Sequence, residues 1–437
     1  MKKFYIHTLG CKVNQYESDG IATCLEEQGW TKGEKNKGTD VFIINTCAVT
    51  SKASMQSRQA IRKILRENPD ARVVVTGCHA QTDPDQIQKI DRIDQIICHK
   101  DKIKIAKNIT SIYKNNAALP FKKTDHSKIM PFIGFDHAVK GKMTRAYLKI
   151  QDGCNAFCTY CIVPYARGSS VSMPEKKVLQ HLKELKDSGF KEVIITGIHT
   201  GMYGLDFKKK SSLLQLLEKI NNEKPVFRIR LSSIEPGEIN DGIINLAKKE
   251  NILCDHFHIP LQSGDDDILK KMKRPYDVAL FEDIIHKIHE KIPSAGIGVD
   301  TLIGFPSETE KQFENTYELI KRLPISYLHV FPFSARKGTP AFHFDNKVDP
   351  AIIKNRCEKM RELDKTKRRA FIAANLNKKL EGLVQHKPDT KTGMLKAVTS
   401  NYLTVFLNQK HDHRGKIIDL IPEQCDSDLN IMGKIIA

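Results

Sequence analysis

The hydrophobic pattern of the first hundred residues alternates between short apolar runs and amphipathic helical segments. Residues 2–11 (KKFYIHTLGC), 40–47 (DVFIINTC) and 71–78 (ARVVVTGC) are β-rich runs that each end in a cysteine. The two segments between them repeat apolar side chains about one helical turn apart, and Thr50 is a suitable N-cap for the second. Apolar strands that alternate with helices are typical of a parallel α/β sheet.

The three cysteines that end these runs are Cys11, Cys47 and Cys78, here called the sheet triad. Because the carboxyl ends of parallel strands lie along one edge of a sheet, where ligands bind, we expect the three thiols to be neighbours. The alternative is three buried hydrophobic cysteines, which is less consistent with the same position in three successive strands. We interpret Cys24, within a helical segment, and Cys98 as structural.

A second and longer pattern predicts six strands separated by helices, such as the helix that opens at Pro174 and ends before Gly189. Six β/α repeats indicate an open partial barrel, whose functional residues lie at the carboxyl ends of its strands. The predicted strands cover residues 145–151, 192–197, 226–233, 256–262, 297–305 and 327–333.

The segments that follow these strands are unusually polar or rich in glycine. Among their side chains, Ser232, Ser233, Glu235 and Gln262 can hydrogen-bond a sugar or an amino acid. Any one of these segments could be an ordinary turn, but six at one barrel mouth predict a binding site. The segments after the second to the sixth strand read TGIHTG (196–201), SSIEP (232–236), PLQSG (260–264), GFPSETE (304–310) and PFSARKGTPA (332–341).

The segment after the first barrel strand, residues 148–168, holds Cys154, Cys158 and Cys161, here called the barrel triad. Three thiolates so close together bind iron or zinc. A structural zinc site needs a fourth protein ligand, and the motif offers none, whereas a cubane cluster held by three cysteines keeps one iron open. A zinc site completed by a distant cysteine or histidine is the alternative.

The last ninety residues predict a helix followed by a small β-domain. Residues 380–437 alternate in period two, which favours a small antiparallel barrel, a shape that often binds nucleic acid. The helix before it is either an RNA contact or a solvated linker helix. Its basic residues, within 350–379, include Arg356, Arg361, Lys365, Lys367, Arg368 and Arg369.

Size and charge narrow the class of protein. The 437 residues suffice for two or three domains, and no apolar run reaches membrane-spanning length or forms a signal peptide, so we expect a cytoplasmic protein without a membrane contact. In that compartment the 11 cysteines favour metal ligation over disulfides. Most of the net charge of +18 lies in residues 100–149, with 12 basic against 3 acidic residues, and in residues 354–379, with 10 against 3. Two basic segments that flank a catalytic domain suggest an RNA partner.

Seven motifs, taken in order, resemble the methylthiotransferases of the radical S-adenosylmethionine (SAM) superfamily, and the resemblance covers the whole chain, including a C-terminal segment similar to a TRAM domain. Lys12 and Val13 resemble the branch that acts on N6-threonylcarbamoyladenosine at position 37 of tRNA. The branches that act on isopentenyladenosine or on a ribosomal-protein aspartate remain alternatives, as does a non-catalytic metal-containing RNA-binding protein. The motifs are TLGCKVN (8–14), INTCAVT (44–50), VTGCHAQ (75–81), DGCNAFCTYCIVPYARG (152–168), SSIEP, HIPLQSG and GFPSET.

The resemblance implies two [4Fe-4S] clusters and SAM as cofactors. The barrel triad would hold the cluster that binds and cleaves SAM, and the sheet triad would hold an auxiliary cluster. No side chain is expected to act as the catalytic group, because clusters and SAM carry the chemistry. The residues implied near SAM are Tyr160 at the adenine, Thr196 and Gly197 at the methionyl amine, and Ser232 and Glu235 at the ribose.

The implied reaction uses two molecules of SAM to place a methylthio group on carbon 2 of the anticodon-loop adenosine. The implied partners are tRNA, a low-potential electron donor and a sulfur source. The expected organisation is an N-terminal α/β domain (1–113), a basic linker (114–143), a radical SAM partial barrel (144–349), a basic helix (350–379) and a TRAM-like β-barrel (380–437).

Overall fold

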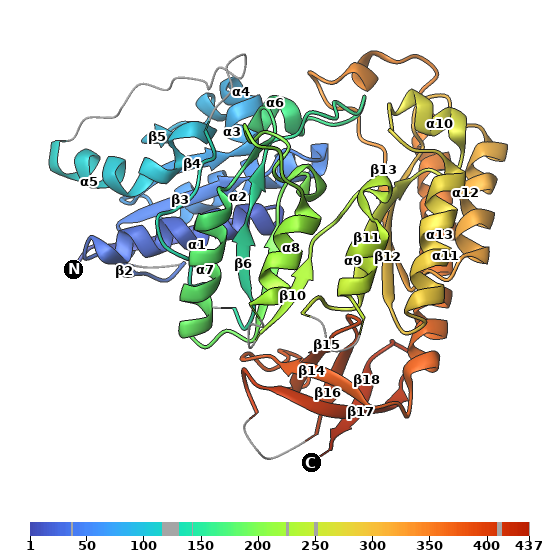
Figure 1. Ribbon diagram of the computed structural model, residues 1–437. Helices are drawn as coiled ribbons and strands as arrows, with labels where there is room; N and C mark the ends of the chain where they lie inside the picture. The colour runs from blue at the N-terminus through green and yellow to red at the C-terminus, as the bar shows by residue number, and fades with distance from the viewer. Residues whose placement is uncertain are drawn as a thin grey trace.

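The computed structural model places an N-terminal sheet beside a partial barrel, with a small closed barrel beneath them (Figure 1), which confirms the predicted fold class. Most of the predicted basic linker, residues 116–130 and 142, lies outside the described residues. In the described ranges, no helix combines the length and the apolar character needed to cross a membrane. These ranges are 1–35, 38–115, 131–141, 143–223, 227–248, 252–408 and 413–436.

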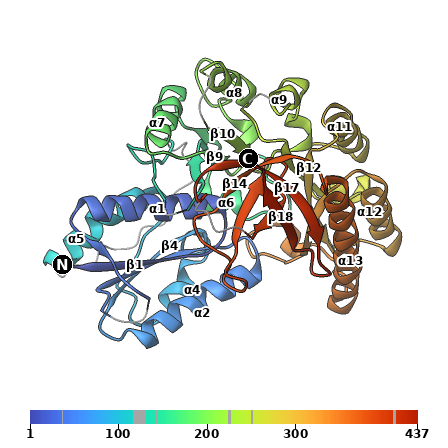
Figure 2. The same cartoon turned by 90° about the horizontal axis from the view of Figure 1, so that it is seen from below.

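The N-terminal sheet is parallel throughout, in the order β2-β1-β3-β4-β5. Alternate strand residues pack on opposite faces, so that α1 covers one face and α2 the other (Figure 2). The side chain of Thr50 caps α2 by accepting from the Ala53 N–H, as predicted. The strands are β1 (Lys3–Thr8), β2 (Thr31–Lys32), β3 (Val41–Thr46), β4 (Arg72–Gly77) and β5 (Gln95–Ile96), and the helices are α1 (Lys12–Glu27), α2 (Ser51–Glu67), α3 (Cys78–Thr82), α4 (Pro84–Gln88), η1 (His99–Lys104) and α5 (Ile105–Asn115).

The six predicted barrel strands form two parallel three-stranded sheets, β6-β9-β10 and β11-β12-β13. The seam between them is crossed by a bridge between Ile229 and Leu253 and by a hydrogen bond from the Ile234 N–H to the His258 carbonyl oxygen (3.0 Å). Outward-facing apolar side chains of the strands share one core with the surrounding helices. The strands are β6 (Ala146–Lys149), β9 (Glu192–Thr196), β10 (Arg228–Leu231), β11 (His256–Gln262), β12 (Gly296–Ile303) and β13 (Tyr327–Pro332).

The barrel helices lie in an arc outside these strands (Figure 2). The short hairpin β7 (Gln151–Asp152) and β8 (Val171–Ser172) brackets the barrel triad. The larger helices are α7 (Glu175–Asp187), α8 (Leu213–Asn222), α9 (Asp241–Leu246), α11 (Val278–Lys291), α12 (Glu310–Arg322) and α13 (Pro350–Asn375), and the short ones are α6 (Val163–Arg167), η2 (Thr200–Met202), η3 (Pro236–Glu238), α10 (Asp266–Lys271) and η4 (Pro340–His343).

Helix α13 is less free to contact RNA than its composition suggests. Arg356 is buried, and its guanidinium donates to the carboxylates of Glu308 (2.8 Å) and Glu310 (2.9 Å). The ammonium of Lys367 donates to two backbone carbonyl oxygens at the C-terminal end of α12. These two side chains fasten α13 to the barrel and are not available to an RNA.

The C-terminal barrel is closed, in the order β14-β15-β16-β18-β17. The prediction of an antiparallel barrel was wrong at one pair, because β16 and β18 run parallel. Five strands in a closed ring cannot alternate in direction throughout, so at least one neighbouring pair must be parallel. The strands are β14 (Leu380–Val384), β15 (Leu395–Thr399), β16 (Thr404–Leu407), β17 (Ile417–Cys425) and β18 (Ile431–Ile435).

The turn between β15 and β16 closes the N-terminal end of the partial barrel. Figure 2 shows the C-terminal barrel on the inner side of the arc of helices. The buried Arg230 donates to the carbonyl oxygens of Ser400 (2.7 Å) and Thr399 (2.9 Å). The ring of Tyr402 stacks on His256, with centroids 4.2 Å apart. This contact forms a floor under the lumen of the partial barrel.

Candidate functional site

The barrel triad lies on a loop that is held at both ends. The Cys154 N–H donates to the Gly168 carbonyl oxygen (3.0 Å). Gly153 has φ +71°, and a Cβ there would lie 2.0 Å from the Ser169 carbonyl oxygen, so glycine is required before Cys154. The side-chain amide of Gln151 donates to the Gly153 carbonyl oxygen (2.7 Å) and its oxygen accepts from the N–H groups of residues 198 and 199. Gln151 therefore fixes the cysteine loop to the end of β9.

Side-chain hydrogen-bond donors lie beside two of the three barrel-triad sulfurs. Arg274 Nη1 lies 3.2 Å from Cys158 Sγ, and His199 Nδ1 lies 3.3 Å from Cys154 Sγ. Donors directed at sulfur stabilise its thiolate and tune the potential of a metal that it binds. Burial raises the pKa of Cys161 to about 12, so this thiol keeps its proton until a metal displaces it.

Arg274 connects three parts of the predicted SAM site. Its guanidinium forms an ion pair with Glu235 and lies 3.4 Å from the hydroxyl of Tyr160, in addition to its contact with Cys158. Tyr276 supports it from behind, since Arg274 Nε donates to the Tyr276 hydroxyl (3.0 Å). Tyr160 and Glu235, which are far apart in the sequence, therefore meet beside the barrel triad.

The other three predicted SAM residues lie at the ends of β9 and β10. Thr196 is buried at the last position of β9, and Gly197 follows it against the side chain of Gln151. Ser232 follows β10 and shares a hydrogen bond of 3.2 Å with Thr200. Four of the five predicted residues thus follow or end barrel strands beside the cysteine loop, and the fifth, Tyr160, lies within that loop.

Sequence reasoning missed Arg274, His199 and Glu238. His199 Nε2 lies 2.6 Å from a Glu238 carboxylate oxygen. Burial disfavours the charged imidazole, but the hydrogen bonds to Cys154 and Glu238 outweigh it and raise the pKa of His199 to about 10. His199 lies in the TGIHTG segment that the sequence had marked, whereas Arg274 follows a short helix in a run that resembles an ordinary basic turn.

The structure brings the sheet triad together at the carboxyl edge of the N-terminal sheet. A Cβ at Gly10 would lie 2.9 Å from Cys47 Sγ, so Cys47 packs directly against the residue before Cys11. Cys47 and Cys78 are buried, whereas Cys11 is exposed. Burial, and then the neighbouring Cys78 thiol, raise the pKa of Cys47 to about 11.

The sheet triad also adjoins the barrel triad. Cys78 shares an apolar cluster with Ile162 and Ala166, and Ile162 directly follows Cys161 in the chain. Helices α3, which begins at Cys78, and α6 are in contact. The two triads therefore both lie close to the joint between the N-terminal sheet and the partial barrel.

A buried group of charges fastens this joint. Glu17 of α1 accepts hydrogen bonds from Lys102 (2.6 Å), Lys149 (3.2 Å) and Arg167 (3.0 Å). Asp152 accepts from Lys149 (2.8 Å) and from Arg167 (2.9 Å). We call these five residues the joint network. Its cations hold the pKa of the Glu17 and Asp152 carboxyls well below the ordinary range despite their burial.

The cysteine thiols of neither triad are gathered as closely as the ligands of a single ion. In a tetrahedral zinc site the sulfurs lie about 4 Å apart. Within the described part of the chain, two groups of three ligand atoms lie within 4.8 Å of one another, and neither cysteine triad is among them. Three thiols at a wider spacing could each ligate one iron of an iron-sulfur cubane, and three protein ligands leave its fourth iron open.

Comparison with known proteins gives two matching family models. Residues 3–98 match "Uncharacterized protein family UPF0004" and residues 148–320 match "Radical SAM superfamily". The threonylcarbamoyladenosine tRNA methylthiotransferase MtaB of Bacillus subtilis is 37% identical over 94% of this chain and 92% of its own length. The protein of the same name from Aquifex aeolicus is 35% identical over 96% of this chain and 100% of its own length.

Other relatives carry a different substrate in their name. A tRNA-2-methylthio-N(6)-dimethylallyladenosine synthase of Clostridium botulinum is 30% identical over 96% of this chain and 94% of its own length. Among solved structures, the radical SAM methyltransferase TsrM from Kitasatospora setae is similar with a TM-score of 0.57 and 13% identity, covering 78% of this chain and 74% of that one. At that identity the likeness shows the fold alone.

Proposed function

Because the chain belongs to the radical SAM tRNA methylthiotransferases, we propose that it methylthiolates carbon 2 of N6-threonylcarbamoyladenosine at position 37 of tRNA. The observation that carries this choice is the identity of 33–37% to five relatives named for that nucleoside, against 30–31% to the relatives named for dimethylallyladenosine. The dimethylallyl nucleoside is therefore the second candidate substrate.

The family implies SAM and [4Fe-4S] chemistry, and we propose that the chain holds two such clusters. The barrel triad would hold the one that binds SAM, and the sheet triad would hold an auxiliary one. With SAM bound, a reduced cluster supplies a 5'-deoxyadenosyl radical, which can remove the unactivated hydrogen of an adenine carbon that acid or base groups cannot remove at neutral pH.

We propose that the polypeptide itself positions SAM and excludes water from the site. We propose that Glu235, held by Arg274, accepts hydrogen bonds from ribose hydroxyls and that Tyr160, which also contacts Arg274, lies beside the adenine. We propose that Thr196 and Gly197, at the end of β9, lie beside the methionyl part of SAM. We propose that Ser232, which shares a hydrogen bond with Thr200, contacts the ribose.

The closeness of both triads to the joint supports transfer of sulfur across it. Cys78 packs in one apolar cluster with Ile162, the residue after Cys161, so a methylthio group held at the sheet triad would lie near the proposed SAM site. The reaction needs a sulfur source and a low-potential electron donor, since a cluster of this type must be reduced before it cleaves SAM. We propose that the C-terminal barrel and the exposed basic residues of α13 contact the tRNA backbone.

The test uses anaerobically reconstituted protein, SAM, a chemical reductant and tRNA that carries N6-threonylcarbamoyladenosine. We expect iron close to eight atoms per chain and, after digestion, a nucleoside heavier by one methylthio group. The Cys158→Ala variant is the matched control and should form neither this nucleoside nor 5'-deoxyadenosine. Product from dimethylallyladenosine tRNA alone would favour the second candidate.

A further inference from the structure

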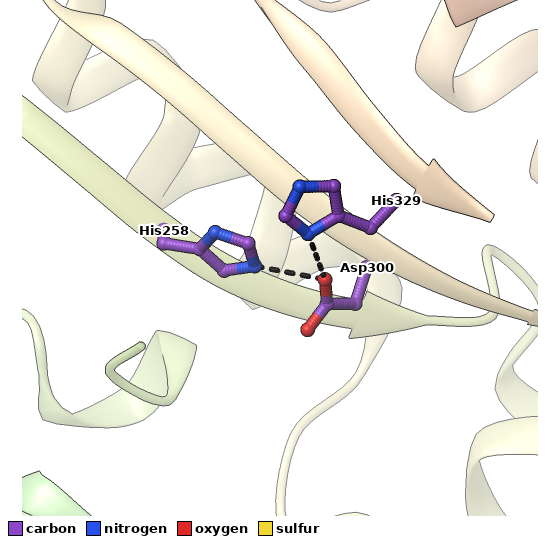
Figure 3. Close-up of side chains that lie close together, drawn as sticks. All are labelled: His258, Asp300 and His329. Carbon is purple, nitrogen blue, oxygen red and sulfur yellow. Dashed lines mark hydrogen bonds and ion pairs between the residues drawn. The ribbon is translucent and has the colours of Figure 1, made fainter. Parts of the chain in front are cut away.

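A group of polar side chains on the lumen side of β11–β13 lies outside the cysteine site. His258, Asp300 and His329 come from three adjacent parallel strands, and Asp300 is in register with His329 (Figure 3). His258 Nε2 lies 2.8 Å and His329 Nδ1 lies 3.2 Å from the same oxygen, Asp300 Oδ1. Both imidazoles therefore donate to one carboxylate, and these bonds lower its pKa although burial opposes this.

Exposure rises toward the edge strand β13. The side chain of His258 is 12% exposed, that of Asp300 20% and that of His329 47%. Phe331, two residues further along β13 on the same face, is 42% exposed, and its ring lies 6.4 Å from that of His329. We call these four residues the lumen wall. It presents a polar ring and an aromatic face to an incoming ligand.

A chain of contacts fixes His258 from below. Its Nδ1 lies 3.4 Å from the Tyr327 hydroxyl, which lies 2.8 Å from Nε2 of His256. His256 in turn stacks on Tyr402 of the floor. Both ring nitrogens of His258 are thus engaged, whereas Nε2 of the half-exposed His329 has no partner among the described residues.

Cationic side chains outnumber carboxylates around His256 at the lower end of the lumen. Lys12, Arg145 and Arg230 each act electrostatically on His256, which places their charges around the lower lumen. Glu192 is ion-paired with two of them. A lumen with this balance favours an anionic or strongly polar group over an apolar one.

We propose that His329, oriented by Asp300, hydrogen-bonds the N6 substituent of the target adenosine, and that the lumen accepts adenosines whose substituent ends in hydrogen-bonding or anionic groups. This inference rests on the proposed function and names the residue that reads its substrate. A flipped adenine can stack on Phe331, as bases taken out of a helix commonly do on aromatic side chains. A threonylcarbamoyl group offers a carboxylate, a hydroxyl and a urea to His329, whereas a dimethylallyl group offers none and would leave the imidazole desolvated without a partner.

The test compares the affinity of the protein for a modified and an unmodified anticodon stem-loop. Anaerobically reconstituted full-length protein is titrated into two fluorescent anticodon stem-loops that are identical except for threonylcarbamoyladenosine or adenosine at position 37. We expect His329→Phe to remove at least about tenfold of the preference for the modified loop, which corresponds to one charge-assisted hydrogen bond. His329→Gln, which keeps a hydrogen-bonding group, should retain part of the preference.

The control is His286→Phe on the outer face of α11, where the histidine is 58% exposed, and it should keep the full preference. Iron content and circular dichroism check that each variant is folded and loaded. An undiminished preference in His329→Phe overturns the inference, while methylthiolation of threonylcarbamoyladenosine tRNA by the unaltered protein would still uphold the function. One equivalent of zinc or manganese that is present in the unaltered protein and lost in His329→Phe also overturns it, since the group would then be a metal site.

Discussion

Replacing Glu17 by glutamine tests whether the joint network holds the two triads together. The substitution keeps the shape of the side chain but removes the charge that Lys102, Lys149 and Arg167 share at 2.6–3.2 Å. Asp152 would then be the one carboxylate left in the network to balance three buried cations. Breaking a buried ion pair costs about 3–5 kcal/mol, because an uncompensated charge stays in the interior.

The assay is urea unfolding of the cluster-free protein, together with iron analysis after reconstitution. With an m-value of about 3 kcal/mol per molar urea, the midpoint should fall by roughly 1–1.7 M. The matched control is Glu282→Gln, whose partner Arg322 lies 2.7 Å away on the surface with side chains 29% and 54% exposed, and which should cost at most about 1 kcal/mol. Equal midpoint shifts in the two variants would refute the reasoning. Arg167 acts electrostatically on all three sheet-triad thiols, and Glu17 holds its guanidinium in place. Glu17→Gln should therefore displace Arg167 from the thiols and also retain less iron.

Three further predictions follow from the site. Cys47→Ala should lose methylthiolation and about half of the iron while it keeps part of the SAM cleavage, measured as 5'-deoxyadenosine; full methylthiolation would contradict the role of the sheet triad. Arg274→Met should weaken SAM binding in calorimetric titration at least about tenfold, because Glu235 loses its partner, and an unchanged affinity would argue against that arrangement. Burial lowers the pKa of His99 from 6.5 to about 4, so between these values the unfolded chain binds a proton that the folded chain does not, and stability should fall as the pH drops through this window. Urea midpoints at neutral pH and at about pH 5 should therefore differ less in His99→Gln, and identical pH dependences would count against this account.

The strands could be predicted from the sequence because their burial leaves a strong local signal. All six barrel strands lie within or beside their predicted ranges, and the sheet-triad cysteines each stand at the end of a run such as Val41–Thr46. The position of a cysteine at a strand end follows from the pattern alone. The ends of two such strands lie together because parallel strands have their carboxyl ends at the same edge of the sheet.

The contacts that complete the site could not be predicted, because they join residues that no local pattern relates. Arg274 meets Cys158 across 116 positions in the chain, and Arg167 meets Glu17 across 150. In the sequence, Glu17 resembles any polar residue of an amphipathic helix, and nothing near it indicates burial. The parallel partner of β16 was missed because ring closure, rather than alternation of side chains, decides it.

The floor made by Tyr402 and its neighbours closes the partial barrel at the N-terminal ends of its strands. Whatever reacts inside must come and go past the rim where the strands stop. An anticodon loop bound at that rim would block the open end of the barrel, so that methionine could not leave and a second SAM could not enter. If the chain uses two molecules of SAM in each cycle, as its family resemblance implies, we expect the RNA to dissociate between the two uses, so that dissociation and rebinding of the loop set the rate of the cycle.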